Sequence, residues 1–90
     1  MTSYEFEVGA KNAVISTCHE LYGEDYIIGD IQVVWFAHVL GNKKAILIDM
    51  GPNNRIYEVT YNLREDEMYV DAYKKESNSV VRKIDKVAHT

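Results

Sequence analysis

Alternating apolar and polar residues predict an antiparallel β-hairpin over residues 56–75, and the rest of the chain is interpreted around it. Val, Ile, Thr and Tyr dominate both arms, and these residue types fit a pleated, half-buried surface. The charged residues Arg64, Glu65 and Asp66 mark the bend, and a two-residue or a four-residue turn there gives the same pairing. The apolar face of this hairpin then carries three cross-strand pairs, Tyr61 with Met68, Val59 with Val70 and Tyr57 with Ala72.

The other face of the hairpin places two carboxylates directly opposite each other, Glu58 and Asp71. Like charges in such a pair destabilise a sheet, so a positive charge is expected nearby. One interpretation is that Lys74, Lys75 or Arg55 leans over the pair, or that water screens it. The other is a site for a cation or a basic partner, although no His or Cys lies at a spacing suited to structural zinc. The candidate binding residues on this face are Glu58, Asp71, Tyr69, Tyr73 and Thr60.

The N-terminal residues predict a helix over about residues 3–22. Thr2 and Glu5 have the spacing of a capping box, and Gly23 is a natural helix stop. The stripe expected to face a sheet has helical spacing and consists of Phe6, Ala10, Ala13, Val14, Thr17 and Leu21. Cys18 is expected to be a small core residue.

Residues 31–40 form the most apolar stretch, and a tight turn at Gly41 and Asn42 is expected to connect them to a second strand over residues 43–50. In that register one face carries Trp35 opposite Ile48 and Ala37 opposite Ile46. The other face carries Phe36 opposite Leu47, His38 opposite Ala45 and Val34 opposite Asp49. Both faces are largely apolar, and one helix covers only one of them, so the second face predicts an association surface. The predicted homodimer interface contains Val34, Phe36, His38 and Leu47.

Together these elements predict a single α+β domain over residues 1–90, with an N-terminal helix packed on a four-stranded antiparallel β-meander. The strands are expected at about residues 31–40, 43–50, 56–62 and 67–74, and a fifth, edge strand at 79–85 stays open. The connector over residues 23–30 is expected to be either one turn or the start of a strand.

The charge of the chain is −4 overall and is unevenly distributed. Residues 1–30 hold six acids against Lys11 alone, whereas residues 74–90 hold five bases against two acids. The acidic front argues against a broad nucleic-acid surface, and the basic tail is expected to neutralise acidic surface of this chain or of a neighbour. No stretch is long and apolar enough to span a membrane, and the single cysteine suits a reducing cytoplasm.

The sequence contains no convincing catalytic motif. His38 lies among apolar residues, and Asp49 is too far along the predicted strands to orient it as a general base. Glu58 with Asp71 is the one paired-carboxylate candidate, but a helix and a few short strands leave little room for a cleft. No cofactor is expected. Exposed tyrosines beside carboxylates are instead typical of a binding surface, with cross-strand packing as the alternative interpretation.

Four segments of the chain carry a resemblance to a known family: Val33-Val34-Trp35, Asn42-Lys43-Lys44-Ala45, residues 57–62 (YEVTYN) and residues 69–75 (YVDAYKK). They resemble small proteins of unknown function encoded by phages and prophages of low-GC Gram-positive bacteria. The alternation of Tyr, acidic and apolar residues in the last two segments is also similar to PepSY and cystatin-like modules. Those modules pack a helix on an antiparallel meander and bind or inhibit other proteins.

Three functional hypotheses follow. The first is a cytoplasmic phage accessory protein that binds and modulates a host factor, for example a defence nuclease or its regulator, without catalysis of its own. The second is a homo-oligomer that binds a small molecule or nucleotide between its tyrosines. The third is a small metal-assisted enzyme that uses Glu58 and Asp71.

Overall fold

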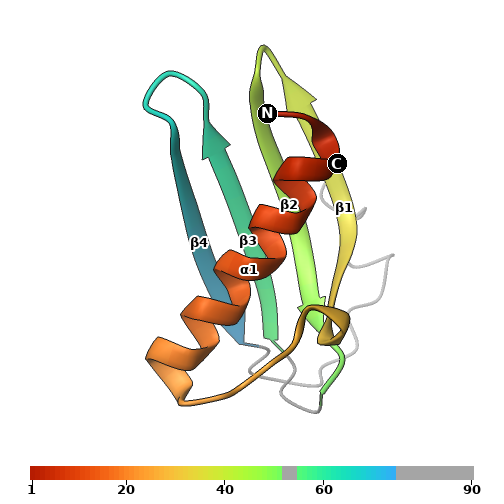
Figure 1. Ribbon diagram of the computed structural model, residues 1–90, viewed down its shortest axis with the longest axis vertical. Helices are drawn as coiled ribbons and strands as arrows, with labels where there is room; N and C mark the ends of the chain where they lie inside the picture. Colours follow the sequence, from red (N-terminus) through yellow and green to blue (C-terminus); the bar gives the residue numbers. More distant parts are fainter. Residues whose placement is uncertain (52–54, 75–90) are drawn as a thin grey trace, which may run out of the picture.

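The computed structural model describes residues 1–51 and 55–74, which form one helix lying diagonally across one side of a four-stranded antiparallel sheet (Figure 1). The strands follow one another in the order β1-β2-β3-β4, so the predicted α+β fold with a helix on a meander is confirmed. The elements are α1 (Ser3–Tyr22), the single 3-10 turn η1 (Ile28–Asp30), β1 (Ile31–Val39), β2 (Asn42–Asp49), β3 (Arg55–Asn62) and β4 (Glu67–Lys74). The strand proposed for residues 79–85 lies outside the described residues.

Both ends of α1 are fixed by the residues that the sequence singled out. The backbone N–H of Glu5 donates to Thr2 Oγ1 (3.1 Å), and the backbone N–H of Thr2 donates to Glu5 Oε1 (2.7 Å), which completes the capping box. The hydrogen bonds from the backbone and side chain of Thr2 lower the pKa of the Glu5 carboxyl. At the other end Gly23 adopts φ +66°, a left-handed conformation that favours glycine.

The hydrophobic core lies between α1 and the sheet. One narrow stripe of the helix is fully buried, and it recurs every four residues at Phe6, Ala10, Val14 and Cys18. The sheet contributes Ile31, Ala45, Leu47, Tyr57, Val59 and Tyr61. Cys18 is therefore a core residue as expected, whereas Leu21, predicted to face the sheet, is 63% exposed because it lies in the last turn of α1, off this stripe.

The β1–β2 hairpin departs from the predicted register. Its turn residues are Leu40 and Gly41, with φ of 52° and 83°, and Asn42 is already in β2 opposite Val39. The side chain of Asn42 accepts a hydrogen bond from the backbone N–H of Leu63 (2.9 Å), which ties this turn to the neighbouring β3–β4 loop. A bulge between Val33 and Trp35 shifts the pairing again.

The β3–β4 hairpin has the predicted register at every pair, from Ile56 opposite Tyr73 to Asn62 opposite Glu67. The hydroxyl of Tyr61 donates to Asp66 Oδ1 (2.7 Å), and Asp66 itself adopts φ 51° in the loop. This side-chain bond helps to fix the bend between the two strands.

Candidate functional site

The face of the sheet opposite α1 is the candidate functional site, and we call it the open face. α1 is the only described element of more than one turn outside the sheet, and it packs on the other side (Figure 1). Alternation along β3 makes the contrast clear, since Tyr57 and Val59 are fully buried while Ile56 between Arg55 and Tyr57 is 47% exposed.

The strand pairings arrange the open face in three rows that cross the sheet. The first row is Gln32, Ile48, Ile56 and Tyr73, the second is Trp35, Ile46, Glu58 and Asp71, and the third is Ala37, Lys44, Thr60 and Tyr69. Trp35, Tyr69 and Tyr73 each leave about half of their surface exposed (50%, 45% and 54%). Trp35 lies on one edge strand and the two tyrosines lie on the other, so the exposed aromatic side chains border the open face on both sides.

The five predicted binding residues all lie on this face. Glu58 is directly opposite Asp71, as the sequence predicted. Lys44 Nζ lies 3.6 Å from Glu58 Oε2 and is the cation that offsets the pair. The prediction of Lys74, Lys75 or Arg55 in this role is wrong for Arg55, which is buried on the helix side with Glu24. Lys74 pairs with Arg55 across the strands, on that same side, and Lys75 lies outside the described residues.

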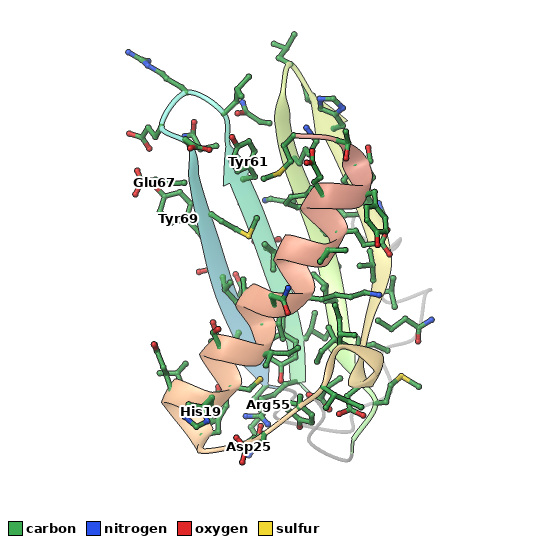
Figure 2. All side chains as sticks on the ribbon, viewed as in Figure 1. His19, Asp25, Arg55, Tyr61, Glu67 and Tyr69 are labelled. Carbon is green, nitrogen blue, oxygen red and sulfur yellow. The ribbon has the colours of Figure 1, made fainter. Side chains whose placement is uncertain are left out.

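Asp71 makes no ion pair with any residue in the described ranges. Two further carboxylates, Glu65 and Glu67, lie at the end of the sheet where β3 and β4 are joined. The hydroxyl of Tyr69 donates to Glu65 Oε1 (3.2 Å), and partial burial together with this carboxylate raises the pKa of Tyr69. Figure 2 shows Tyr69 and Glu67 near one another at this end of β4. The open face therefore has an apolar half on β1 and β2 and an acidic half on β3 and β4.

The predicted homodimer interface lies mostly on the face of the sheet that α1 covers. Leu47 is fully buried in the core, and Phe36 lies on the helix side with its ring 5.6 Å from that of Phe6. His38 is exposed opposite Lys43 on that same side, and Val34 is 51% exposed at the bulge. Phe36, His38 and Leu47 do share one face, as the sequence predicted, but it is the face on which α1 packs, so Leu47 belongs to the core and is not available to a second subunit. The apolar surface left uncovered belongs to Trp35 and its neighbours instead.

Two consecutive buried hydrogen bonds link α1 to the sheet. Cys18 Sγ donates to the hydroxyl of Tyr57 (3.2 Å), and that hydroxyl donates to Asp49 Oδ2 (2.7 Å). Burial raises the pKa of both the Cys18 thiol and the Tyr57 hydroxyl, so neither is an activated nucleophile. These hydrogen bonds therefore have a structural role. Within the described residues no group of three or more His, Cys, Asp or Glu side chains is placed to hold a metal ion.

A second charged cluster lies where α1 ends, and sequence reasoning missed it. The buried Arg55 guanidinium forms an ion pair with Glu24, and its central carbon lies 3.7 Å from the centroid of the Tyr22 ring. Burial disfavours the charged form of Arg55, but hydrogen bonds to Glu24 and Tyr22 outweigh it and raise its pKa. Arg55 is on the same face of β3 as the buried residues Tyr57 and Val59. A charged residue at a buried position needs an ionic partner, and this could have been inferred from the sequence.

The fold is a small α+β module in which one helix covers one face of a four-stranded sheet. The chain belongs to DUF6275, a family of unknown function, whose model matches residues 8–83. No curated protein and no solved structure matches the chain. None of the helices in the described ranges is long and apolar enough to cross a membrane.

Proposed function

We propose that this chain is a non-catalytic phage or prophage accessory protein that binds and modulates a host protein in the bacterial cytoplasm through the open face. The observation that carries the proposal is the set of half-exposed aromatic residues Trp35, Tyr69 and Tyr73 on one side of a continuous sheet. Aromatic side chains provide a large contact area with few rotatable bonds, and they dominate the binding energy of protein interfaces. A sheet holds them in fixed positions before binding.

The charge of the open face indicates what kind of partner it fits. Asp71 is exposed without an ion pair among the described residues, Glu58 is paired only with Lys44, and Glu67 continues the acidic half along β4. The chain as a whole carries a charge of −4. A basic protein surface with an apolar border complements this arrangement, and the nucleic-acid groove of a defence nuclease has that character.

The size of the open face favours a regulated complex over a permanent homodimer. Four strands of eight or nine residues present a face of about 20 by 26 Å, or roughly 500 Å² on each partner. Two such faces bury roughly 1,000 Å² in total, which is typical of transient complexes, whereas obligate dimers bury about 2,000 Å² or more. A second copy of the chain is nevertheless an outcome that the experiment must distinguish.

The test compares the chain with a variant of its open face in host lysate. The double variant Trp35→Ser, Tyr73→Ser removes two aromatic side chains from the open face. Tyr4→Ser removes one of similar size that is 75% exposed on α1 and serves as the matched control. We expect a host protein captured by the natural chain and by the Tyr4 variant, but not by the double variant.

The captured protein is then purified and titrated in two salt concentrations. The proposal predicts that binding weakens as salt increases, because complementary charges are screened, and that DNA competes for the basic partner. Capture that the double variant leaves unchanged contradicts the proposal. Light scattering tests the alternative that the open face binds a second copy of the chain. A mass of twice 10.4 kDa for the natural chain that falls to 10.4 kDa in the double variant assigns the open face to a homodimer.

A further inference from the structure

A charged hollow of about 250 Å³ lies at the end of α1, on the helix side of the sheet and away from the open face. The described residues that line it are Tyr22, Glu24, Arg55 and Lys74. Arg55 and Lys74 are directly opposite each other on β3 and β4, so the strand pairing brings two cations to one wall. Figure 2 shows Arg55 at this end of the sheet, beside the last turn of α1.

The guanidinium of Arg55 is held in place before any ligand arrives. Its side chain is 6% exposed, Glu24 accepts a hydrogen bond from its Nη2, and the Tyr22 ring lies against it. Arginine has five N–H donors, and Nε has no hydrogen-bond partner in the part of the chain that the structure describes. Arg55 also lines the hollow, and its unpaired donor shows that Glu24 alone does not satisfy the guanidinium.

Lys74 supplies the second positive charge. It is exposed and makes no ion pair within residues 1–51 and 55–74. Among the residues that the structure describes, Arg55 and Lys74 face Glu24 alone, so this part of the lining carries a net charge of +1 (two cations minus one carboxylate). The hollow is therefore suited to an anion.

We propose that this hollow binds the phosphate group of a small molecule. Arg55 provides a planar donor set that matches phosphate oxygens, and Lys74 adds a mobile point charge on the same side. A phosphate has more negative charge and more acceptor oxygens than a carboxylate, which suits the two cations better. The volume is below the range of about 300–1,000 Å³ for drug-sized ligands, so the site accommodates a small phosphorylated molecule or the phosphate end of a larger one.

The probe is inorganic phosphate, titrated calorimetrically into the full chain at matched ionic strength in chloride. We expect saturable binding that Lys74→Gln weakens about tenfold, the effect of losing one charge-assisted contact. The matched control is Lys44→Gln, which removes a lysine from the open face and is expected to leave phosphate binding unchanged.

Replacing Arg55 risks the fold because the side chain is buried, so Glu24→Gln provides the second test. It removes the carboxylate that competes for Arg55 and raises the net charge of the lining from +1 to +2. Circular dichroism confirms that the variant is folded, and its affinity for phosphate is expected to rise severalfold. Absence of saturable binding to the natural chain, or equal loss in the Lys74 and Lys44 variants, overturns the proposal.

Discussion

The two faces of the sheet are built from the same strands and differ in what their apolar residues do. On the helix side Leu47, Tyr57 and Val59 are fully buried and make the core. On the open face Trp35, Ile56 and Tyr73 are comparable in size and hydrophobicity but remain about half exposed (50%, 47% and 54%). Folding explains the first set. The second set gains little from folding, and the proposal that the open face binds a partner rests on this difference.

Covering the exposed aromatic side chains of the open face would contribute considerable binding free energy. A half-exposed aromatic side chain keeps about 100 Å² in water, and covering it is worth roughly 2–3 kcal/mol at about 25 cal/mol per Å². Three such residues carry enough free energy to anchor a complex even after part of it is lost to ordering the partners. The predictions below test this division of roles between the two faces.

The largest difference is expected between Leu47→Ala and Ile56→Ala. Leu47 is fully buried, so its truncation leaves a cavity and lowers the free energy of unfolding by about 2–5 kcal/mol. Ile56 is on the open face and is expected to lose less than about 1 kcal/mol. Urea denaturation followed by circular dichroism measures both. Equal losses would show that the open face is covered and packed in solution.

Replacing Tyr57 by Phe is expected to lower the free energy of unfolding by about 1–3 kcal/mol, because Asp49 Oδ2 loses its buried donor. The variant also changes the response to alkali. Because burial raises the pKa of Tyr57 in the folded chain, its contribution to stability is complete below its unfolded pKa of about 10 and decreases as the pH rises above it. Urea midpoints at pH 8 and above pH 10 should therefore fall more steeply in the natural chain than in Tyr57→Phe, and identical slopes would contradict this assignment.

Gly41→Ala is expected to destabilise the fold by about 1–2 kcal/mol, since an L residue is strained at φ 83°. A Cβ at this position would also meet Leu63 Cδ2 at 2.3 Å, but that side chain is 51% exposed and can move aside. The double variant Gly41→Ala, Leu63→Ala separates the two effects. Recovery of most of the lost stability in the double variant would show that the contact, and not the backbone, is decisive.

The smallest effect is expected for Asp71→Asn on the open face. The change removes the repulsion between Asp71 and Glu58, so the free energy of unfolding should stay the same or rise by about 0.5 kcal/mol. A loss above about 1 kcal/mol would mean that Asp71 has a stabilising partner. Loss of a chemical activity at unchanged stability would instead favour the metal-assisted enzyme.

The β3–β4 hairpin could be predicted in full because its two faces differ in polarity. A shift of one residue would place Tyr57 and Val59 on the same face as Asp71 and Tyr69 of β4, so the sequence tolerates only one register. The β1–β2 hairpin has no such difference in polarity to specify its register. Both of its faces are apolar, and neither the bulge next to Val34 nor the turn at Leu40 changes the pattern enough to be detected.

Contacts between elements distant in the sequence were beyond prediction for a different reason. Lys44 and Glu58 meet only because of the β2–β3 register, and Glu24 reaches Arg55 across 31 residues. No local pattern encodes either pair. On β3 and β4 the register was predicted correctly; on β1 and β2 the pairing was wrong, but Trp35, Ile46 and Ile48 were still grouped on one face, and only the choice of the face that α1 covers was wrong.

The exposure of Trp35 tests the central claim most directly, because it is the single tryptophan of the chain and lies within the open face. Acrylamide quenching of its fluorescence reports this exposure, first in the purified chain and then with the captured host protein added. We predict strong quenching and long-wavelength emission in the isolated chain, with several-fold weaker quenching in the complex. Quenching that is already weak in the isolated chain, or that the host protein leaves unchanged, would contradict the assignment of the open face as its binding surface.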